Sequence, residues 1–353
     1  MYVKTIALRN FRNHNELTFE FTPGLNVING ENGVGKTSLV EAIYYLSLGR
    51  SFRTYDDLEL INKQTDQALI KAEIVRGKIK DRLRVVFSQN GRKVYINDKP
   101  ISKMSELAKL VNVALFEPKD VLLFKGSPRE RRNYLDISIA KKHHTYLGYI
   151  SNYEKLLKER NALLKQEKPD ADLLEATTDM MVRLSGPIVS FRTQYIQDID
   201  NILNKIIRAL THERMHATIE YKPFVDYDSN FSNNALEAFN KALEGDLRRK
   251  ITSIGIHRED FCMTLNGDDI AVFGSQGENR LAAIALKLAP YFLIEEKELK
   301  PIIILDDVLS ELDIEHQQRL VSFVSKMEQV FITTTKTKVE NVKTYTLVRK
   351  GNN

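Results

Sequence analysis

The stretch from Gly30 to Thr37, which reads Gly-Glu-Asn-Gly-Val-Gly-Lys-Thr, has the residue types and spacing of a phosphate-binding loop. Glycine allows backbone conformations that other residues avoid, so successive N–H groups can turn inward around a phosphate. The ammonium group of Lys36 suits the β- and γ-phosphates of a nucleotide, and the hydroxyl of Thr37 suits Mg²⁺. A glycine-rich turn with an unrelated lysine is the alternative. We predict a nucleoside triphosphate site formed by Gly30, Glu31, Asn32, Gly33, Val34, Gly35, Lys36, Thr37 and Ser38.

Two adjacent carboxylates far along the chain have the right setting to complete this site. Asp306 and Asp307 directly follow the run Ile302–Leu305, which predicts a strand buried on both faces. At the end of such a strand, beside the phosphate loop, Asp306 is expected to orient Mg²⁺ through Thr37. Asp307 is expected to polarise the attacking water, so Asp307, Lys36 and Asp306 form the predicted catalytic set. A helix cap or a turn is the alternative for two such aspartates.

A second anion site is predicted at Ser275 and Gly277. These residues precede a segment whose apolar positions, from Leu281 to Leu288, follow helical spacing. The free N–H groups at the start of a helix attract anions. Serine caps helices in many proteins, so this signal depends on its position shortly before the acidic strand.

The elements that must position these residues are strands at both ends of the chain. A short apolar run before Gly30 predicts a strand, and the apolar spacing after Thr37 predicts a helix. Three alternating segments between residues 68 and 96, with Asn90-Gly91 between the last two, predict a β-meander with a hairpin. Further strands are expected at Val3–Leu8, Leu17–Phe21, Val111–Phe116, Thr252–Leu265, Ile302–Leu305 and Gln329–Thr334.

Helical periodicity dominates the middle of the chain, from Ser127 to about Arg249. Lys168–Asp170 and Ser185–Pro187 are expected to break these helices. A packed bundle is favoured over a long protruding coiled coil, because no stretch sustains enough heptads. For the phosphate loop and the acidic strand to serve one site, both ends of the chain must form one lobe. The predicted fold is therefore a two-lobed α/β protein: residues 1–125 and 290–353 form a phosphate-loop lobe with an antiparallel β-meander, and residues 126–289 form a mainly helical lobe.

The composition is that of an ordinary soluble globular protein, with 42% hydrophobic and 28% charged residues in a chain of 353. The single cysteine, Cys262, excludes a disulfide framework, and the sequence has no apolar run long enough to span a bilayer. We expect a cytoplasmic protein without a signal peptide. The net charge of +5 permits nucleic-acid binding without proving it. A basic region early in the helical lobe is the candidate DNA contact, with a solvated helix surface as the alternative; it comprises Arg129, Arg131, Arg132, Lys141 and Lys142.

The order of these features resembles the ABC-type ATPase heads of the structural-maintenance-of-chromosomes and Rad50 kind, and most specifically the RecF family of bacterial recombination mediators. The order is phosphate loop, helical insertion, Ser-x-Gly signature, Asp-Asp strand end and a Ser-x-x-Asp loop at Ser310. The resemblance covers nearly the whole chain. The other stretches that carry it are Leu8–Arg12, Leu48–Arg53, Gly126–Arg132, Gly255–Asp260 and Leu305–Val308.

This resemblance implies an ATP-dependent homodimer, in which ATP on the phosphate loop of one subunit is covered by Ser275 and Gly277 of the other. It implies binding to DNA near single-strand/double-strand junctions and gaps, and work with RecO and RecR to load RecA, in support of the SOS response. Arg12 is a candidate nucleotide contact, and a structural ion pair is equally compatible with its position.

The chain departs from transporter ATPases at two positions. Asp307 replaces the usual catalytic glutamate, and Thr333 to Thr335 stand where a histidine is usual. These departures suggest slow hydrolysis that acts as a timer, and the resemblance implies that DNA stimulates it. Two other functions stay open: a soluble ATPase subunit of a membrane transporter, and a structural DNA clamp that binds ATP without hydrolysing it.

Overall fold

The computed structural model describes residues 1–335 and 343–348, and these divide into two compact units. The first unit comprises Met1–Asp120, Ala209–Glu213 and Leu281–Asn353, of which residues 336–342 and 349–353 lie outside the described residues. The second unit comprises Val121–Arg208 and Arg214–Arg280. The divisions fall after residues 120 and 280, whereas the sequence suggested residues 125 and 289.

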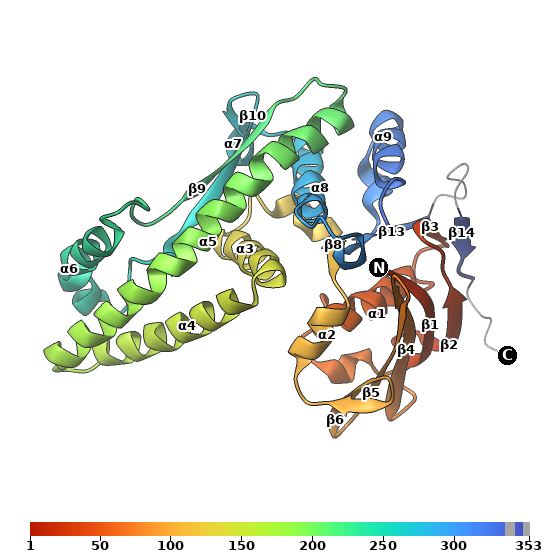
Figure 1. Ribbon diagram of the computed structural model, residues 1–353, viewed down its shortest axis with the longest axis horizontal. Helices are drawn as coiled ribbons and strands as arrows, with labels where there is room; N and C mark the ends of the chain where they lie inside the picture. Colours follow the sequence, from red (N-terminus) through yellow and green to blue (C-terminus); the bar gives the residue numbers. More distant parts are fainter. Residues whose placement is uncertain (336–342, 349–353) are drawn as a thin grey trace. The chain divides into compact units, whose positions relative to one another are not determined.

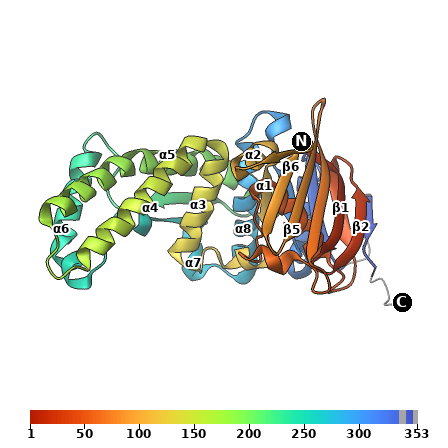
Figure 2. The same ribbon diagram turned by 90° about the horizontal axis from the view of Figure 1, so that it is seen from below.

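An antiparallel sheet forms one layer of the first unit (Figure 2). Its six strands follow the order β2-β1-β4-β5-β6-β7. The hairpin at Asn90-Gly91 is confirmed, because Ser88 pairs with Gly91 across the turn. The strands are β1 (Tyr2–Phe11), β2 (His14–Glu20), β4 (Gln67–Arg76), β5 (Ile79–Ser88), β6 (Gly91–Ile96) and β7 (Lys99–Ile101).

A parallel sheet of five strands, in the order β14-β3-β13-β12-β8, forms the second layer of this unit. Parallel strands end at the same edge, so the residues that follow β3, β12 and β13 lie close together. All four residues of β12 are buried, as the sequence predicted. The strands are β3 (Gly24–Asn29), β8 (Val113–Phe116), β12 (Ile302–Leu305), β13 (Gln329–Thr334) and β14 (Lys343–Thr346).

Helix α1 (Lys36–Leu48) follows the phosphate loop and is buried on nearly all sides. Its apolar residues belong to one core cluster that also contains residues of both sheets. The loop is therefore anchored at a strand of the parallel sheet and at a buried helix. The other helical segments that fall wholly or partly in this unit are η1 (Asp57–Leu60), α2 (Met104–Leu110), η2 (Pro118–Leu122), the end of α5 (Ala171–Thr211), α8 (Gln276–Phe292), η4 (Lys297–Leu299), η5 (Val308–Glu311) and α9 (Ile314–Val324).

The second unit is mainly helical, with a three-stranded sheet in the order β11-β10-β9. Helices α4 and α5 lie alongside each other (Figures 1 and 2), and leucines near their junction form a small core cluster. The elements are α3 (Pro128–Lys142), α4 (His144–Leu164), α5 (Ala171–Thr211), β9 (Ala217–Lys222), α6 (Phe231–Arg249), η3 (Ile256–Arg258), β10 (Asp260–Leu265), β11 (Asp268–Asp269) and α7 (Ile270–Phe273).

A buried arginine on α5 connects the helices of this unit to its sheet. Arg192 donates to Asp136 of α3 at 2.9 Å and to Glu259, beside β10, at 2.6 Å. An unpaired guanidinium would be costly to bury, so the two carboxylates fix α3 and β10 against α5.

One prediction for the middle of the chain was wrong. Pro187 does not break the helix, because α5 continues through it from Ala171 to Thr211. Ile188 and Val189 are fully buried next to it, and this packing outweighs the one backbone hydrogen bond that proline removes. The helical region also contains a strand, β9, whose pairing with β10 is a non-local interaction.

Candidate nucleotide-binding site

The phosphate loop connects β3 to α1 and is held from outside by the turn between β1 and β2. Asn13 Nδ2 donates to the Gly33 carbonyl at 3.1 Å, and His14 Nε2 lies 3.0 Å from the Gly35 carbonyl. Gly35 has φ of 103°, and a side chain there would overlap the His14 imidazole. Burial lowers the pKa of His14, so the neutral ring donates to the Gly35 carbonyl. Neither Asn13 nor His14 was predicted from the sequence.

Lys36 reaches back across its own loop. Its Nζ donates to the carbonyls of Gly30 at 2.7 Å and Glu31 at 2.8 Å. Burial lowers the pKa of Lys36, and the charges of Asp307 and Asp306 act against this effect. The ammonium group therefore lies inside the curve of the loop, where an anionic ligand would stabilise its charge.

The structure brings together Thr37 and Asp306, which are distant in sequence. Thr37 Oγ1 donates to Asp306 Oδ1 at 3.2 Å. Thr333, at the end of β13, donates to the same oxygen at 2.6 Å and accepts from the Asp307 N–H at 2.8 Å. From the sequence, Thr333 was noted only as standing where a histidine is usual. Its bridging position follows from β13 lying between β3 and β12.

Asp306 is a buried carboxylate, and among the described residues it has no cationic side chain within ion-pair distance. Only 4% of its surface is exposed, and its hydrogen-bond partners are the two threonine hydroxyls. Burial raises the pKa of Asp306, although both hydroxyls lower it in part. Asp307 is exposed and has a left-handed backbone, with φ of 48°, which turns it away from the strand.

This donor set fits Mg²⁺. A hydroxyl and a carboxylate oxygen lie within 3.2 Å of each other beside the phosphate loop, and hard oxygen donors are those that Mg²⁺ prefers. Within residues 1–335 and 343–348 there is no cluster of three or more His, Cys, Asp and Glu side chains that could hold a metal. Mg²⁺ at this position would therefore depend on Thr37, Asp306, nucleotide oxygens and water.

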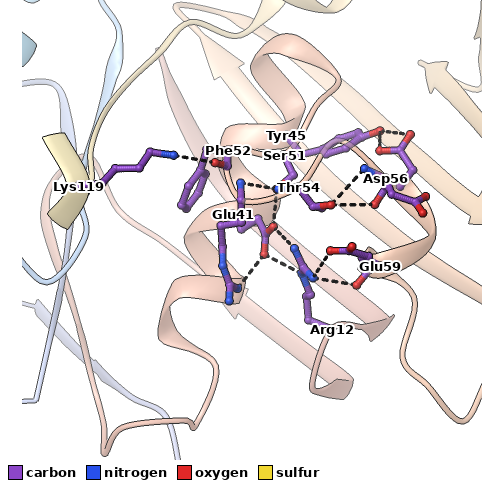
Figure 3. A network of polar contacts seen from close by, with 11 residues as sticks. Arg12, Glu41, Tyr45, Ser51, Phe52, Thr54, Asp56, Glu59 and Lys119 are labelled. Carbon is purple, nitrogen blue, oxygen red and sulfur yellow. Dashed lines mark hydrogen bonds and ion pairs between the residues drawn. The ribbon is translucent and has the colours of Figure 1, made fainter. Parts of the chain in front are cut away.

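A second buried carboxylate, Glu41 on α1, has a complete set of partners (Figure 3). Arg12 donates from Nε at 3.0 Å and from Nη2 at 2.6 Å, and Arg53 donates at 3.2 Å. Ser51 Oγ adds a hydrogen bond of 2.5 Å. Arg12 also donates to the Glu59 carbonyl at 2.9 Å. Arg12, a candidate nucleotide contact, is therefore engaged in the structural ion pair that the sequence left open.

The signature residues Ser275 and Gly277 are exposed at the start of α8. Ser275 and Glu278 form a reciprocal capping box, in which each side chain accepts from the other residue's N–H, at 3.2 and 2.8 Å. Asn279 donates to the carbonyls of Gly274 and Ser275, both at 2.9 Å, and so fixes the preceding turn. The helix start is rigid and its outer side is open.

The basic region does not form a single exposed surface. Arg129 is exposed, while Arg132 is half-buried and donates to the Glu259 carbonyl at 2.7 Å. Lys142 forms an ion pair with Asp198 at 3.2 Å, and Lys141 is half-buried.

Arg131 requires a correction. It is buried, and its guanidinium donates to both oxygens of Asp260, at 2.7 and 2.8 Å. Its Nη1 donates to three carbonyls that precede α3. A side chain used in this way stabilises the start of α3 and cannot also reach a DNA phosphate, so the prediction for Arg131 was wrong.

The first unit combines a phosphate loop at a parallel sheet with an antiparallel meander, and the helical unit contains a Ser-x-Gly helix start. Together these features define an ATPase head of the ABC and SMC type. The family model described as "RecF/RecN/SMC N terminal domain" matches residues 2–352. The DNA replication and repair protein RecF of an Exiguobacterium species is 38% identical over 95% of this chain and 92% of the relative. The corresponding Bacillus subtilis protein is 35% identical over 95% of this chain and 93% of the relative.

Solved structures that resemble this chain also include RecF. The recombination mediator protein RecF with ATPrS, from the RecFOR pathway, has a TM-score of 0.86 and 31% identity, covering 99% of this chain and 96% of that one. A Pyrococcus furiosus Smc head has a TM-score of 0.57 and 17% identity over 95% of this chain and 90% of that one, which shows the fold alone. The chain therefore belongs to the RecF/RecN/SMC family and, within it, to the RecF proteins. None of its described helices has the length and apolarity needed to cross a membrane.

Proposed function

We propose that this chain is an ATP-dependent DNA-binding protein of recombinational repair and replication-fork maintenance. The observation that carries the proposal is the contact of Thr37 with Asp306 beside a preformed phosphate loop, in a chain similar to RecF along 95% of its length. Family membership favours this function over a transporter ATPase subunit.

In this proposal the loop from Gly30 to Ser38 binds the phosphates of ATP, and Lys36 exchanges its carbonyl partners for phosphate oxygens. Thr37 and Asp306 would hold Mg²⁺, which would supply positive charge to neutralise the phosphates. Asp307 orients the attacking water. Thr333 holds Asp306 and the backbone of Asp307 in fixed positions through two hydrogen bonds. Hydrolysis is slow, because aspartate reaches less far than the usual glutamate, so it works as a timer.

ATP joins two copies of the chain. The exposed Ser275 and Gly277 of one copy cover the triphosphate of the other, and their helix start supplies N–H groups to the γ-phosphate. The rigid capping box keeps this surface preformed, so dimerisation needs little reorganisation of α8.

The dimer binds gapped or junction DNA in the cytoplasm. Arg129, Arg132, Lys141 and Lys142 stay candidates for phosphate contact, and Arg131 is removed from the set. RecR and RecO are the proposed partners for loading RecA and supporting the SOS response.

The test measures the affinity for gapped DNA and for intact duplex, with and without ATP and Mg²⁺, over a series of salt concentrations. We expect ATP to strengthen binding, with preference for gapped DNA, and affinity to fall steeply with salt. Equal affinity with and without ATP would contradict the proposal.

A non-hydrolysing clamp is distinguished by phosphate release. Wild type should release phosphate slowly with DNA present, and Asp307→Asn should release at least tenfold less. Equal release by the two proteins would favour the clamp.

A further inference from the structure

A cavity of about 600 Å³ lies in the second unit, away from every residue assigned above to ATP. One wall is a stripe of α5 at helical spacing, which includes Arg183, Pro187 and Phe191. The rest of the lining comprises His143, the loop residues Tyr227 to Ser229, and Phe231 and Ser232 at the start of α6. Gly186 and Pro187 also line the cavity, and a Cβ at Gly186 would lie 3.7 Å from the Phe231 ring.

Aromatic rings supply much of the lining. Phe191 lies 5.0 Å from the His143 ring, and Tyr227 lies 5.5 Å from the Phe231 ring. Tyr227 is 47% exposed, so its ring is accessible from solvent. Burial and then the charge of Lys142 lower the pKa of His143, so at neutral pH its imidazole is an uncharged flat surface. Such walls suit a planar, uncharged group.

The charged residues around the cavity affect where the phosphates attached to such a planar group could lie. Asp198 and Asp228 line the cavity, and their carboxylates would repel a phosphate inside it. Cations lie nearby: Lys142 Nζ contacts Asp198 at 3.2 Å, and Arg183 is exposed on the α5 wall. The carboxylates disfavour a phosphate beside them, and Lys142 and Arg183 supply cations for the phosphates attached to a bound ring.

We propose that this cavity binds one unstacked base of single-stranded DNA, between the aromatic residues of α5 and Tyr227. The inference rests on the proposed DNA-binding function and adds a single-strand contact to it. Stacking on aromatic side chains tolerates every base, because each base has a π-face, and it needs a single strand, because bases in a duplex are already stacked. The cavity therefore provides a physical means of distinguishing a gap from intact duplex.

The experiment compares wild type, Tyr227→Ala and Tyr227→Phe with the matched control Tyr55→Ala. Tyr55 is fully exposed and belongs to the first unit, so its removal tests for general effects of losing a surface tyrosine. Affinity is measured by fluorescence anisotropy for a single-stranded oligonucleotide and for a blunt duplex of the same length. We expect Tyr227→Ala to bind the single strand about tenfold more weakly. Tyr227→Phe and Tyr55→Ala should match wild type, and duplex affinity and salt dependence should not change.

Each of the other outcomes contradicts either the base-binding cavity or the proposed function. All measurements contain ATP and Mg²⁺, and if wild type then binds neither of the two DNAs nor the gapped DNA described above, the proposed function fails. If wild type binds DNA and Tyr227→Ala matches Tyr55→Ala, the base-binding cavity fails and the proposed function stands. Equal weakening for single strand and duplex also overturns the cavity, because stacking requires an unpaired base. If Tyr227→Ala keeps its DNA affinity and loses binding to RecR, the cavity binds a protein side chain instead of a base.

A second measurement does not depend on a variant. An oligonucleotide containing 5-iodouracil, irradiated in complex with wild type, should crosslink to Tyr227 or Phe191, as mapped by mass spectrometry of the peptides. Crosslinks confined to peptides outside residues 183–198 and 227–232 would contradict the proposal.

Discussion

Glu41 and Asp306 are both buried carboxylates of the first unit, and their surroundings differ. Glu41 is fully buried, with two arginines and a serine hydroxyl around it. Asp306 is 4% exposed and has two threonine hydroxyls instead. A buried charge is stable only when a partner compensates for lost water. Glu41 has its cations in the fold, whereas the side-chain partners of Asp306 among the described residues are hydroxyls, and we propose that a cation bound with the nucleotide compensates its charge.

The two carboxylates differ in role: Glu41 maintains the structure around the site, whereas Asp306 lies where the ligand is expected to bind. Glu41 connects α1 to the turn containing Arg12 and to the segment containing Arg53, so it fixes the helix behind the phosphate loop. Asp306 faces Thr37 at the loop itself. Replacing the first should affect stability most, and replacing the second should affect ligand binding most.

The largest loss of stability is expected for Glu41→Gln. The substitution keeps the size of the side chain and leaves Arg12 and Arg53 without their shared carboxylate, so the free energy of unfolding should fall by about 3 kcal/mol. Urea denaturation measures this loss. Glu59→Gln is the matched control, because Glu59 is exposed and lies 3.9 Å from Arg12. The control should stay within about 0.5 kcal/mol of wild type. Similar losses of unfolding free energy for Glu41→Gln and Glu59→Gln would show that the buried ion pairs of Glu41 do not stabilise the fold more than an exposed carboxylate does.

A smaller loss is expected for Thr333→Val. Valine keeps the branched shape but leaves the Asp307 N–H without a partner and leaves Asp306 Oδ1 with Thr37 alone, which should cost roughly 1–2 kcal/mol. Thr333→Ser retains the hydroxyl and should recover most of this loss in the same denaturation assay. If serine and valine are equally destabilising, the hydroxyl does not have the bridging role described here.

The smallest effect on stability is expected for Asp306→Asn, and it should depend on pH. Because burial raises the pKa of Asp306 above its ordinary 3.8, the folded state binds the proton more readily than the unfolded state does. Wild type therefore loses stability relative to the variant as the pH rises through the raised pKa. Denaturation at several pH values measures the difference, which should be smallest below pH 3.8. A difference that shrinks with rising pH would contradict this sign.

The same variant should lose its response to nucleotide. ATP with Mg²⁺ should raise the unfolding temperature of wild type, by mass action, and should leave Asp306→Asn nearly unchanged. Equal stabilisation of both proteins would show that Asp306 does not hold the cation.

Much of the site could be predicted because its signals are local. The spacing of glycines and lysine identifies the phosphate loop after a strand. The apolar run before Asp306 identifies a strand with a carboxylate at its end. Neither signal depends on residues elsewhere in the chain. The strands Ile302–Leu305 and Gln329–Thr334 have the predicted bounds for the same reason.

What could not be predicted depends on distant partners. Thr333 acquires its role only when β13 lies between β3 and β12. Arg131 is removed from the surface by Asp260, which lies far along the chain. Pro187 remains inside α5 because packing outweighs local propensity. In each case the deciding interaction is tertiary, and no pattern near the residue indicates it.

The central claim is that two copies complete each other's ATP site, and light scattering with complementary variants tests it most directly. With ATP and Mg²⁺, wild type should form dimers, and Lys36→Arg and Ser275→Arg should each stay monomeric. Mixed together, the two variants should form dimers again, because the mixed pair contains one intact loop facing one intact signature. Dimers of either variant alone, or no dimers in the mixture while wild type dimerises, would contradict the account.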